Sequence, residues 1–263
     1  MYASGIPLYR PQTMLERYRY FNSVSPSTIV MNALQTFLKT LNDNSILDKF
    51  LLLYPVGDTD QSSRLNLIQA GSFTLTDVGT APTFVSGVAG AGGFTANGAN
   101  LSTGFTLAGT TNVSNILGKI SHSNCTFFFD SGTTGSSINR DFGNTSLCIG
   151  LCRTTGDVSS GRVLDASTET IGTGIIDGSG LFAFERSSGQ KQVYRNATSA
   201  GTAARADFSG SSGPTALHVL GNNAGSTGSR RCRLFAVSGN LTATQHTIFY
   251  DAWTAYKTAI GCT

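Results

Sequence analysis

The C-terminal part of the chain constrains the fold most. Residues 232–237 form an apolar run that predicts a buried strand, and the Ser-Gly-Asn that follows predicts a tight turn. A helix is expected over residues 242–260, because Thr242 and Gln245 form a capping box and Gly261 can end the helix. Its apolar side chains recur at helical spacing: Phe249, Ala252, Trp253, Tyr256 and Ile260. One terminal helix after a long strand-rich region is typical of a β-sandwich that a helix covers at an end or edge.

The middle of the chain consists of short runs that predict strands. Each run is apolar or alternating and is bounded by Gly, Ser, Asn or Asp. The runs are residues 64–68, 73–75, 83–85, 125–129, 147–151, 180–186, 191–195, 216–220 and 232–237. Gly189-Gln190 can form the two-residue turn of a hairpin between two of them. So many short strands indicate an all-β sandwich.

Two short helices are expected before the strands, within residues 27–53. Pro26-Ser27-Thr28 is typical of a helix start, and buried positions then recur at helical spacing. These positions are Val30, Ala33, Leu34, Phe37, Leu38 and Leu41. A second helical piece is expected over residues 46–53, ending before Pro55, which cannot continue a helix.

Residues 1–26 show neither helical nor strand periodicity and are expected to form an extended N-terminal arm, separate from a single domain of residues 27–263. The arm is rich in aromatic residues and arginine, which are enriched at protein interfaces. Two alternatives stay open: the arm docks onto another subunit, or it lies along its own domain. The candidate anchoring residues are Tyr9, Arg10, Arg17, Tyr18, Arg19 and Tyr20.

Composition excludes several classes of protein. Charged residues are 13% of the chain, against a usual share of about 25%, so the surface takes its polarity mainly from Ser, Thr, Asn and backbone. The net charge of +3 is too small for a protein that follows a nucleic-acid backbone. Arg231 and Arg233 are expected on the solvent face of their strand.

No apolar run approaches the roughly 18 residues of a membrane span, and the start of the chain lacks the apolar core of a secretory signal. The odd number of cysteines, 5, indicates reduced and buried thiols rather than a disulfide framework.

The sequence predicts no catalytic site, no cofactor and no metal. A glycoside hydrolase needs paired carboxylates, but the glutamates, Glu16, Glu169 and Glu185, have no acid two residues further on. The histidines stand in unrelated contexts, and no Gly-x-Ser-x-Gly motif occurs. Asp58 and Asp60 could offer oxygen ligands to calcium, although solvated loop acids explain them better. The chain is therefore expected not to be an enzyme.

Taken in order, these runs resemble a family of tailed-bacteriophage virion proteins with a concanavalin A-like (LamG-like) jelly-roll domain. The resemblance covers residues 28–261 and omits the arm. The matching segments are Leu53-Tyr-Pro-Val-Gly57, Asn66-Leu67, Phe84 to Gly87, Thr103-Gly104-Phe105, Arg186-Ser187, Tyr194-Arg195-Asn196 and Leu220-Gly221-Asn222-Asn223, followed by Leu234 to Val237, Leu241-Thr242, Phe249-Tyr250, Tyr256 and Gly261. The resemblance implies a concanavalin A-like jelly-roll β-sandwich with short N-terminal helices and one C-terminal helix.

The resemblance also implies a function. Family members are tail-fibre, baseplate or capsid-surface components, and similar jelly rolls often bind carbohydrate. The expectation is a virion protein, assembled in the cytoplasm of the host bacterium, that contacts other virion proteins of the capsid, neck or tail. It is expected to form a homo-oligomer such as a trimer and to bind a host-surface glycan, but neither nucleic acid nor the membrane interior.

Ligand loops would use asparagine side chains, here Asn97, Asn100, Asn139, Asn222 and Asn223. Turn chemistry explains these residues equally well, because asparagine tolerates the left-handed backbone of turns. Two other functions stay open: a capsid decoration or cement protein without a ligand, and a polysaccharide-degrading enzyme with acids on neighbouring strands.

Overall fold

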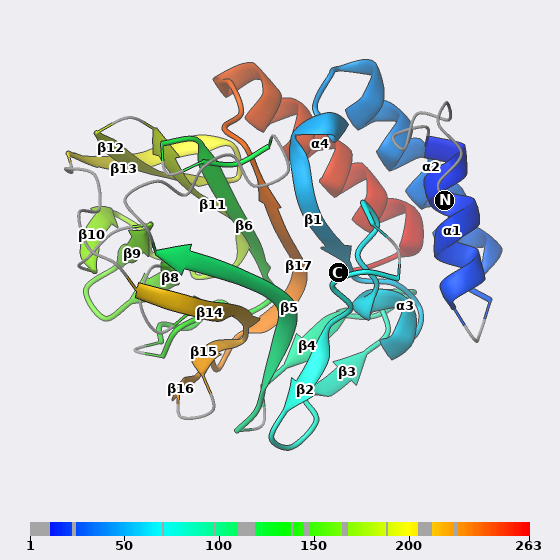
Figure 1. Cartoon of the computed structure of the whole chain (residues 1–263), viewed down its shortest axis with the longest axis horizontal. Coiled ribbons are helices and arrows are strands. Elements are labelled where there is room, and N and C mark those ends of the chain that lie inside the picture. The colour runs from blue at the N-terminus through cyan, green and yellow to red at the C-terminus, as the bar shows by residue number, and fades with distance from the viewer. Residues whose placement is uncertain are drawn as a thin grey trace.

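Two antiparallel sheets and a layer of helices form the molecule (Figure 1). The computed structural model describes residues 11–22, 25–69, 71–96, 98–109, 119–121, 123–137, 139–144, 148–164, 168–187, 189–204, 212–223 and 226–263. The helices are α1 (Pro11–Phe21), α2 (Thr28–Asp43), α3 (Asp60–Arg64) and α4 (Ala243–Ile260), and η1 (Leu47–Lys49) is a single 3-10 turn.

The larger sheet has eight strands. Its order is β13 (Thr198–Ala204), β12 (Gln190–Arg195), β11 (Gly180–Ser187), β6 (Cys125–Ser131), β17 (Arg231–Ser238), β4 (Gly93–Thr95) and β3 (Thr83–Val85). The remaining strand, β1 (Phe50–Pro55), pairs with β17 on the same edge as β4. Strands β6 and β17 are therefore paired on both edges and lie in the middle of the sheet.

The smaller sheet has seven strands. Its order is β10 (Glu169–Gly172), β9 (Val158–Val163), β8 (Cys148–Thr154), β7 (Phe142–Gly143), β14 (Ser212–Val219), β5 (Asn100–Gly109) and β2 (Thr76–Val78). A separate hairpin joins β15 (Gly221–Asn223) to β16 (Ser226–Thr227). The two sheets meet where β10 approaches β13, and the Thr173 amide donates to the Ala200 carbonyl at 3.1 Å. A Cβ on Gly201 would lie 2.2 Å from the Ile171 carbonyl oxygen, so only glycine fits there.

The central strands of the larger sheet are buried on both faces. Along β6, Phe127 and Phe129 belong to the core between the sheets, whereas Phe128 between them belongs to the core under the helices. This alternation follows from the two-residue period of a strand. Because both faces are covered, the central strands are apolar at nearly every position, as in the Cys-Thr-Phe-Phe-Phe of β6.

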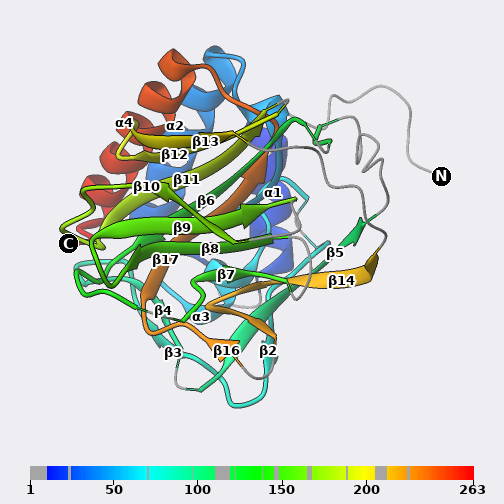
Figure 2. The same ribbon diagram turned by 90° about the vertical axis from the view of Figure 1, so that its left-hand side faces the viewer.

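Helices α2 and α4 cover the outer face of the larger sheet (Figure 2). Helix α4 begins with the predicted capping box between Thr242 and Gln245, and Gly261 ends it in the left-handed conformation with φ 73°. Trp253 is fully buried, as predicted, and its Nε1 donates to Asp130 Oδ2 at 2.9 Å. The predicted fold class is confirmed: the chain is an all-β, concanavalin A-like jelly-roll sandwich with short N-terminal helices and one C-terminal helix.

The N-terminal arm differs from the prediction. An extended conformation was expected over residues 1–26, but residues 11–21 form helix α1. Met14, Leu15 and Tyr18 lie in the core under the helices, and Tyr18 Oη donates to the Ser62 carbonyl at 2.7 Å. This part of the arm therefore lies along its own domain. Residues 1–10, with Tyr9 and Arg10, lie outside the described residues.

The second helix predicted within residues 27–53 is also wrong. Residues 47–49 form only the turn η1, and Phe50–Pro55 is strand β1, which pairs with β17. Every residue of β1 is buried, with side chains on both sides of the sheet. A continuous apolar run gives no periodicity that distinguishes a buried strand from a helix, which explains the error.

Other boundaries shift as well. Residues 64–68 and 73–75 form no strand, since α3 ends at Arg64 and β2 begins only at Thr76. The hairpin of β11 and β12 pairs Ser187 with Gln190, so its turn lies one residue earlier than predicted. Four of the cysteines, Cys125, Cys152, Cys232 and Cys262, are buried free thiols, as expected. In the described part of the chain, no helix combines the length and hydrophobicity needed to cross a bilayer.

Candidate ligand-binding end of the sandwich

Several loops meet at one end of the sandwich. We call the surface formed by residues 133–137, 139–141, 153–157, 173–179, 220–223 and 226–230 the loop end. Backbone hydrogen bonds join these loops to one another. The Gly178 amide donates to the Thr134 carbonyl at 2.8 Å, and the Ile175 amide donates to the Asp157 carbonyl at 2.7 Å. The Leu220 amide donates to the Asp141 carbonyl at 2.8 Å. The loop end is therefore one connected structure.

A buried ion pair lies at the centre of the loop end. Arg230 Nε lies 3.2 Å from Asp141 Oδ2, and the two side chains are 1% and 0% exposed. The rest of the guanidinium donates to three carbonyls, of Thr133, Gly178 and Arg153, at 3.0, 3.2 and 2.7 Å. One side chain thus holds three separate loops. No signal in the sequence predicts the burial of Arg230.

Asp141 is constrained from several sides. Its Oδ2 also accepts the Cys152 amide at 2.7 Å. Burial raises the pKa of Asp141 to about 6, although the charge of Arg230 and the hydrogen bond from Cys152 oppose this rise. The prediction of a solvent-facing side chain is wrong for Arg233, which is only 11% exposed at its side chain and pairs with the buried Asp130 at 3.0 Å. Arg231 is partly exposed.

The outer part of the loop end carries two further ion pairs. Arg153 pairs with Asp157 at 2.6 Å, and Arg195 pairs with Asp177 at 3.2 Å. Burial raises the pKa of Asp177, but hydrogen bonds from Ser179 and the charge of Arg195 outweigh it, so the net direction is downward. Beside Asp177, the side chain of Ile176 is 73% exposed. Charged, polar and apolar groups thus lie together at the surface of the loop end.

Of the predicted ligand asparagines, the structure places Asn139, Asn222 and Asn223 at the loop end. Asn139 is exposed, and its backbone amide donates to Ser137 Oγ at 3.0 Å. Asn100 is fully buried beside His218, with 3.0 Å between its Oδ1 and His218 Nδ1, so it supports the loops rather than facing solvent. Asn222 and Asn223 belong to β15, which lies beside β5 and β7. Asn97 lies outside the described residues.

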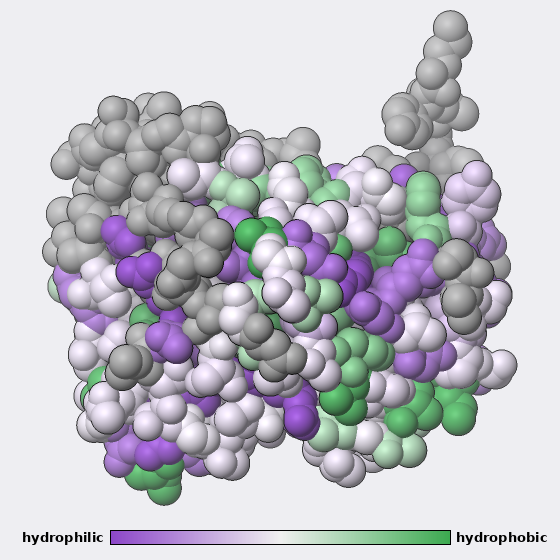
Figure 3. All heavy atoms as spheres, turned by 90° about the horizontal axis from the view of Figure 1, so that it is seen from below, coloured by the Kyte–Doolittle hydropathy of each residue, from purple (hydrophilic) through white to green (hydrophobic). Residues whose placement is uncertain are grey.

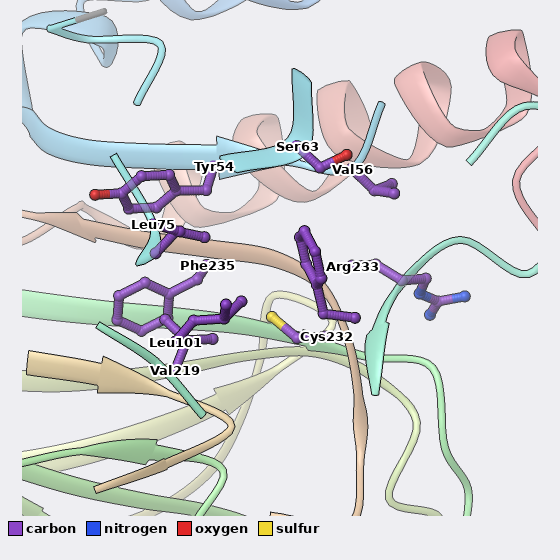
Figure 4. A pocket seen from close by; sticks show the side chains of 10 residues that line it. Tyr54, Val56, Ser63, Leu75, Leu101, Val219, Cys232, Arg233 and Phe235 are labelled. Carbon is purple, nitrogen blue, oxygen red and sulfur yellow. The ribbon is translucent and has the colours of Figure 1, made fainter. Parts of the chain in front are cut away.

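The surface around this hairpin is mixed in character. Figure 3 views the molecule from below Figure 1, where β15 and β16 lie, and shows hydrophilic residues in both halves and a group of hydrophobic residues at the lower right. A small, mainly apolar cavity lies between the two sheets. Side chains that line it, such as Tyr54, Leu101 and Phe235, point toward one another from both sheets (Figure 4). It measures about 10 Å³, room for about one water molecule. A sugar would have to bind at the surface, not in this cavity.

The candidate anchoring residues separate into two groups. Tyr18 is fully buried, whereas Arg19 is exposed and Tyr20 is 83% exposed. Arg17 is half-buried. The Tyr20 ring stands edge-on to the Phe21 ring, with centroids 5.2 Å apart.

The acidic residues are mostly held by basic partners. The carboxylates in ion pairs are Asp43, Asp60, Asp77, Asp130, Asp141, Asp157, Glu169 and Asp177. Glu185 Oε2 lies 3.0 Å from His246 Nε2. Asp58, considered above for calcium, instead accepts the Ser27 amide and Ser62 Oγ. Within the described residues, no group of three or more His, Cys, Asp or Glu side chains could hold a metal ion.

Comparisons with known proteins establish the fold. Neither the family models nor the curated proteins give a match. Among solved structures, a mutant of Trypanosoma rangeli sialidase with trans-sialidase activity is similar at 7% identity and a TM-score of 0.53, over 86% of this chain and 39% of that one. A botulinum neurotoxin type C structure, described by its dependence on two ganglioside molecules for cell entry, is similar at 9% identity and a TM-score of 0.54, over 80% of this chain and 53% of that one.

A third structure, Trypanosoma rangeli sialidase in complex with sialic acid, is similar at 7% identity and a TM-score of 0.50, over 84% of this chain. The chain spans 38% of the length of that sialidase, so the match concerns part of a larger protein. At such identities the similarity establishes a shared β-sandwich fold.

Proposed function

We propose that this chain is a non-enzymatic structural protein of a tailed-bacteriophage virion, displayed as a tail-fibre, spike or capsid-surface component, and that its loop end attaches to carbohydrate on the host surface. The observation that carries the proposal is the convergence of polar loops at one end of the sandwich, fixed from beneath by Arg230. The ganglioside named for the similar toxin structure and the sialic acid named for the similar sialidase support a glycan as the ligand.

The chemistry of the loop end suits a sugar. Hydroxyl groups of a glycan pair with amide, carboxylate and guanidinium groups, and Asn139, Asp177 and Arg195 offer one of each at the surface. The exposed side chain of Ile176 offers an apolar contact for the carbon-bound hydrogens of a sugar ring. Such a site binds weakly, and repeated copies on a virion would gain avidity.

The described acids of the loop end support the proposal of a non-enzyme. A glycosidase needs a carboxylic acid with a raised pKa as proton donor and a second carboxylate a fixed distance away. The pKa of Asp177 is lowered instead, and Asp157 is held by Arg153. Asp141, whose pKa is raised, is fully buried and cannot reach a substrate.

The virion role rests on the resemblance across residues 28–261 and on a surface suited to contact with other proteins, since Tyr20 and Ile29 are 83% and 52% exposed. The same surface favours a second candidate, a capsid cement protein without a ligand.

Residues 1–10 are the segment to delete when anchoring is tested, because Met14 and Tyr18 belong to the core. The shortened protein is expected to fold but to be lost from particles, and normal incorporation would contradict anchoring by this segment.

Glycan binding is tested on the whole chain with an array of capsule and lipopolysaccharide oligosaccharides. The double variant Asn139→Ala/Ile176→Ser is expected to lose binding at least about tenfold, while Thr106→Ala, an exposed change on β5, retains it. Equal binding by both variants would reject the loop end. Absence of binding by the wild-type chain would favour the cement protein, and shortened oligosaccharides would reveal an enzyme.

A further inference from the structure

The outer faces of α2 and α4 form a groove that none of the described residues fills. Its volume is about 310 Å³, and the residues that line it are uncharged. From α2 they include Ile29, Ala33 and Thr36, and from α4 they include Ala252, Ala255 and Ala259. The small side chains leave space between the two helices, and Ile29 is 52% exposed at its edge.

The same chain carries a side chain suited to this groove. Tyr20, at the end of α1, is 83% exposed, so it does not lie in the groove of its own chain. Phe21 supports it, and the Phe21 ring packs so closely on Gly71 that a Cβ there would lie 2.5 Å from the ring. Tyr20 is therefore a supported aromatic projection, and tyrosine loses little side-chain entropy when it is buried at an interface.

Charges beside the two features are complementary. Arg19 is exposed next to Tyr20, and Asp251 is exposed one turn before Ala255 at the border of the groove. Within the described residues, neither Arg19 nor Asp251 makes an ion pair. Opposite charges beside an aromatic projection and a groove fix the orientation in which two surfaces meet.

We infer that the chain self-associates through insertion of Tyr20 of one copy into the groove between α2 and α4 of a second copy, with Arg19 facing Asp251. The two surfaces are different patches of the chain, so the contact is head-to-tail and either closes into a ring or continues along an assembly. This inference specifies the self-association expected of the proposed virion protein, but it does not depend on glycan binding at the loop end.

The test uses sedimentation velocity with the full chain at increasing concentration. The wild-type chain is expected to associate, and Tyr20→Ser and Ala255→Arg are each expected to weaken association by about tenfold or more. Both sites are exposed, so folding should persist, as circular dichroism would check. The control Thr254→Arg adds the same charge on α4 at an exposed position outside the groove lining and should associate normally.

Mixing the two variants gives the sharpest result. Tyr20→Ser retains the groove and Ala255→Arg retains the projection, so the mixture should form a one-to-one dimer although neither variant associates alone. Association of Tyr20→Ser alone, a mixture that stays monomeric, or a wild-type chain that is monomeric at high concentration would each overturn the inference. The outcome is independent of the glycan array, so either proposal can fail without the other.

Discussion

Replacing Arg230 by methionine should destabilise the protein more than any other single change at the loop end. The guanidinium is buried, pairs with Asp141 and donates to three carbonyls. Leaving a buried carboxylate unpaired costs about 3–5 kcal/mol. Each carbonyl that loses its donor adds about 1 kcal/mol, and because such terms overlap we expect a total of about 5 kcal/mol for Arg230→Met.

The assay is urea unfolding followed by tryptophan fluorescence, since Trp253 is the sole tryptophan and is fully buried. The matched control is Arg195→Met, which breaks a pair whose side chains are 25% and 41% exposed, and it should cost about 1 kcal/mol or less. Arg230→Lys retains the charge but not the forked donors, and should fall between the two. This variant provides a measurement if Arg230→Met does not fold.

The cost should also depend on pH. Because burial raises the pKa of Asp141 to about 6, the stability linked to its protonated form is present below the unfolded value of about 3.9 and is lost as pH rises through about 6. Without Arg230 the carboxylate has no compensating charge, so Arg230→Met should cost more at pH 8 than at pH 5. Equal costs for Arg230→Met and Arg195→Met, or a cost that falls with rising pH, would refute the reasoning.

Two further predictions concern the helix layer, both measured by urea unfolding. Phe128→Ala should lower the free energy of unfolding by about 3–5 kcal/mol, because Phe128 is 1% exposed and its ring centroid lies 4.7 Å from that of Phe249. A decrease below about 1 kcal/mol would contradict the packing of α4 on the larger sheet. Thr242→Ala should lower the free energy of unfolding by about 1 kcal/mol, because it removes the cap of α4. Thr247→Ala, at an exposed position of the same helix, should lower it less. A larger decrease for Thr247→Ala than for Thr242→Ala would show that the capping box is unimportant.

The parts of the fold that the sequence predicted are those with a strong local signal. Helix α4 has a capping box, an apolar stripe and a terminal glycine, and it appears at the expected residues. Helix α2 begins after Ser27, whose side chain accepts the Val30 amide as a helix cap does. In both cases local chemistry and burial favour the same structure.

The errors lie where local signals are weak or ambiguous. Strand β1 was expected to be helical because a wholly apolar run suits either structure, and only pairing with β17 decides between them. Strand β13, Thr-Ser-Ala-Gly-Thr-Ala-Ala, has little hydrophobic alternation and depends on pairing with β12. Helix α1 depends on contacts of Tyr18 with a distant part of the chain.

The candidate site was predictable only in part. The sequence predicted ligand loops at asparagines, and Asn139, Asn222 and Asn223 do lie at the loop end. The burial of Asn100 beside His218 and of Arg230 under the loops depends on partners far away in sequence. Arg230 and Asp141 are far apart in the sequence, and the fold of the sandwich brings them together. Their spacing in the sequence therefore could not predict the pair.

The most direct test of the account is hydrogen–deuterium exchange of the whole chain with and without an oligosaccharide that it binds on the array. We expect slower exchange at residues 133–141 and 173–179, with no change along α2 and α4. Protection confined to the helices or to the open face of the smaller sheet would contradict attachment through the loop end.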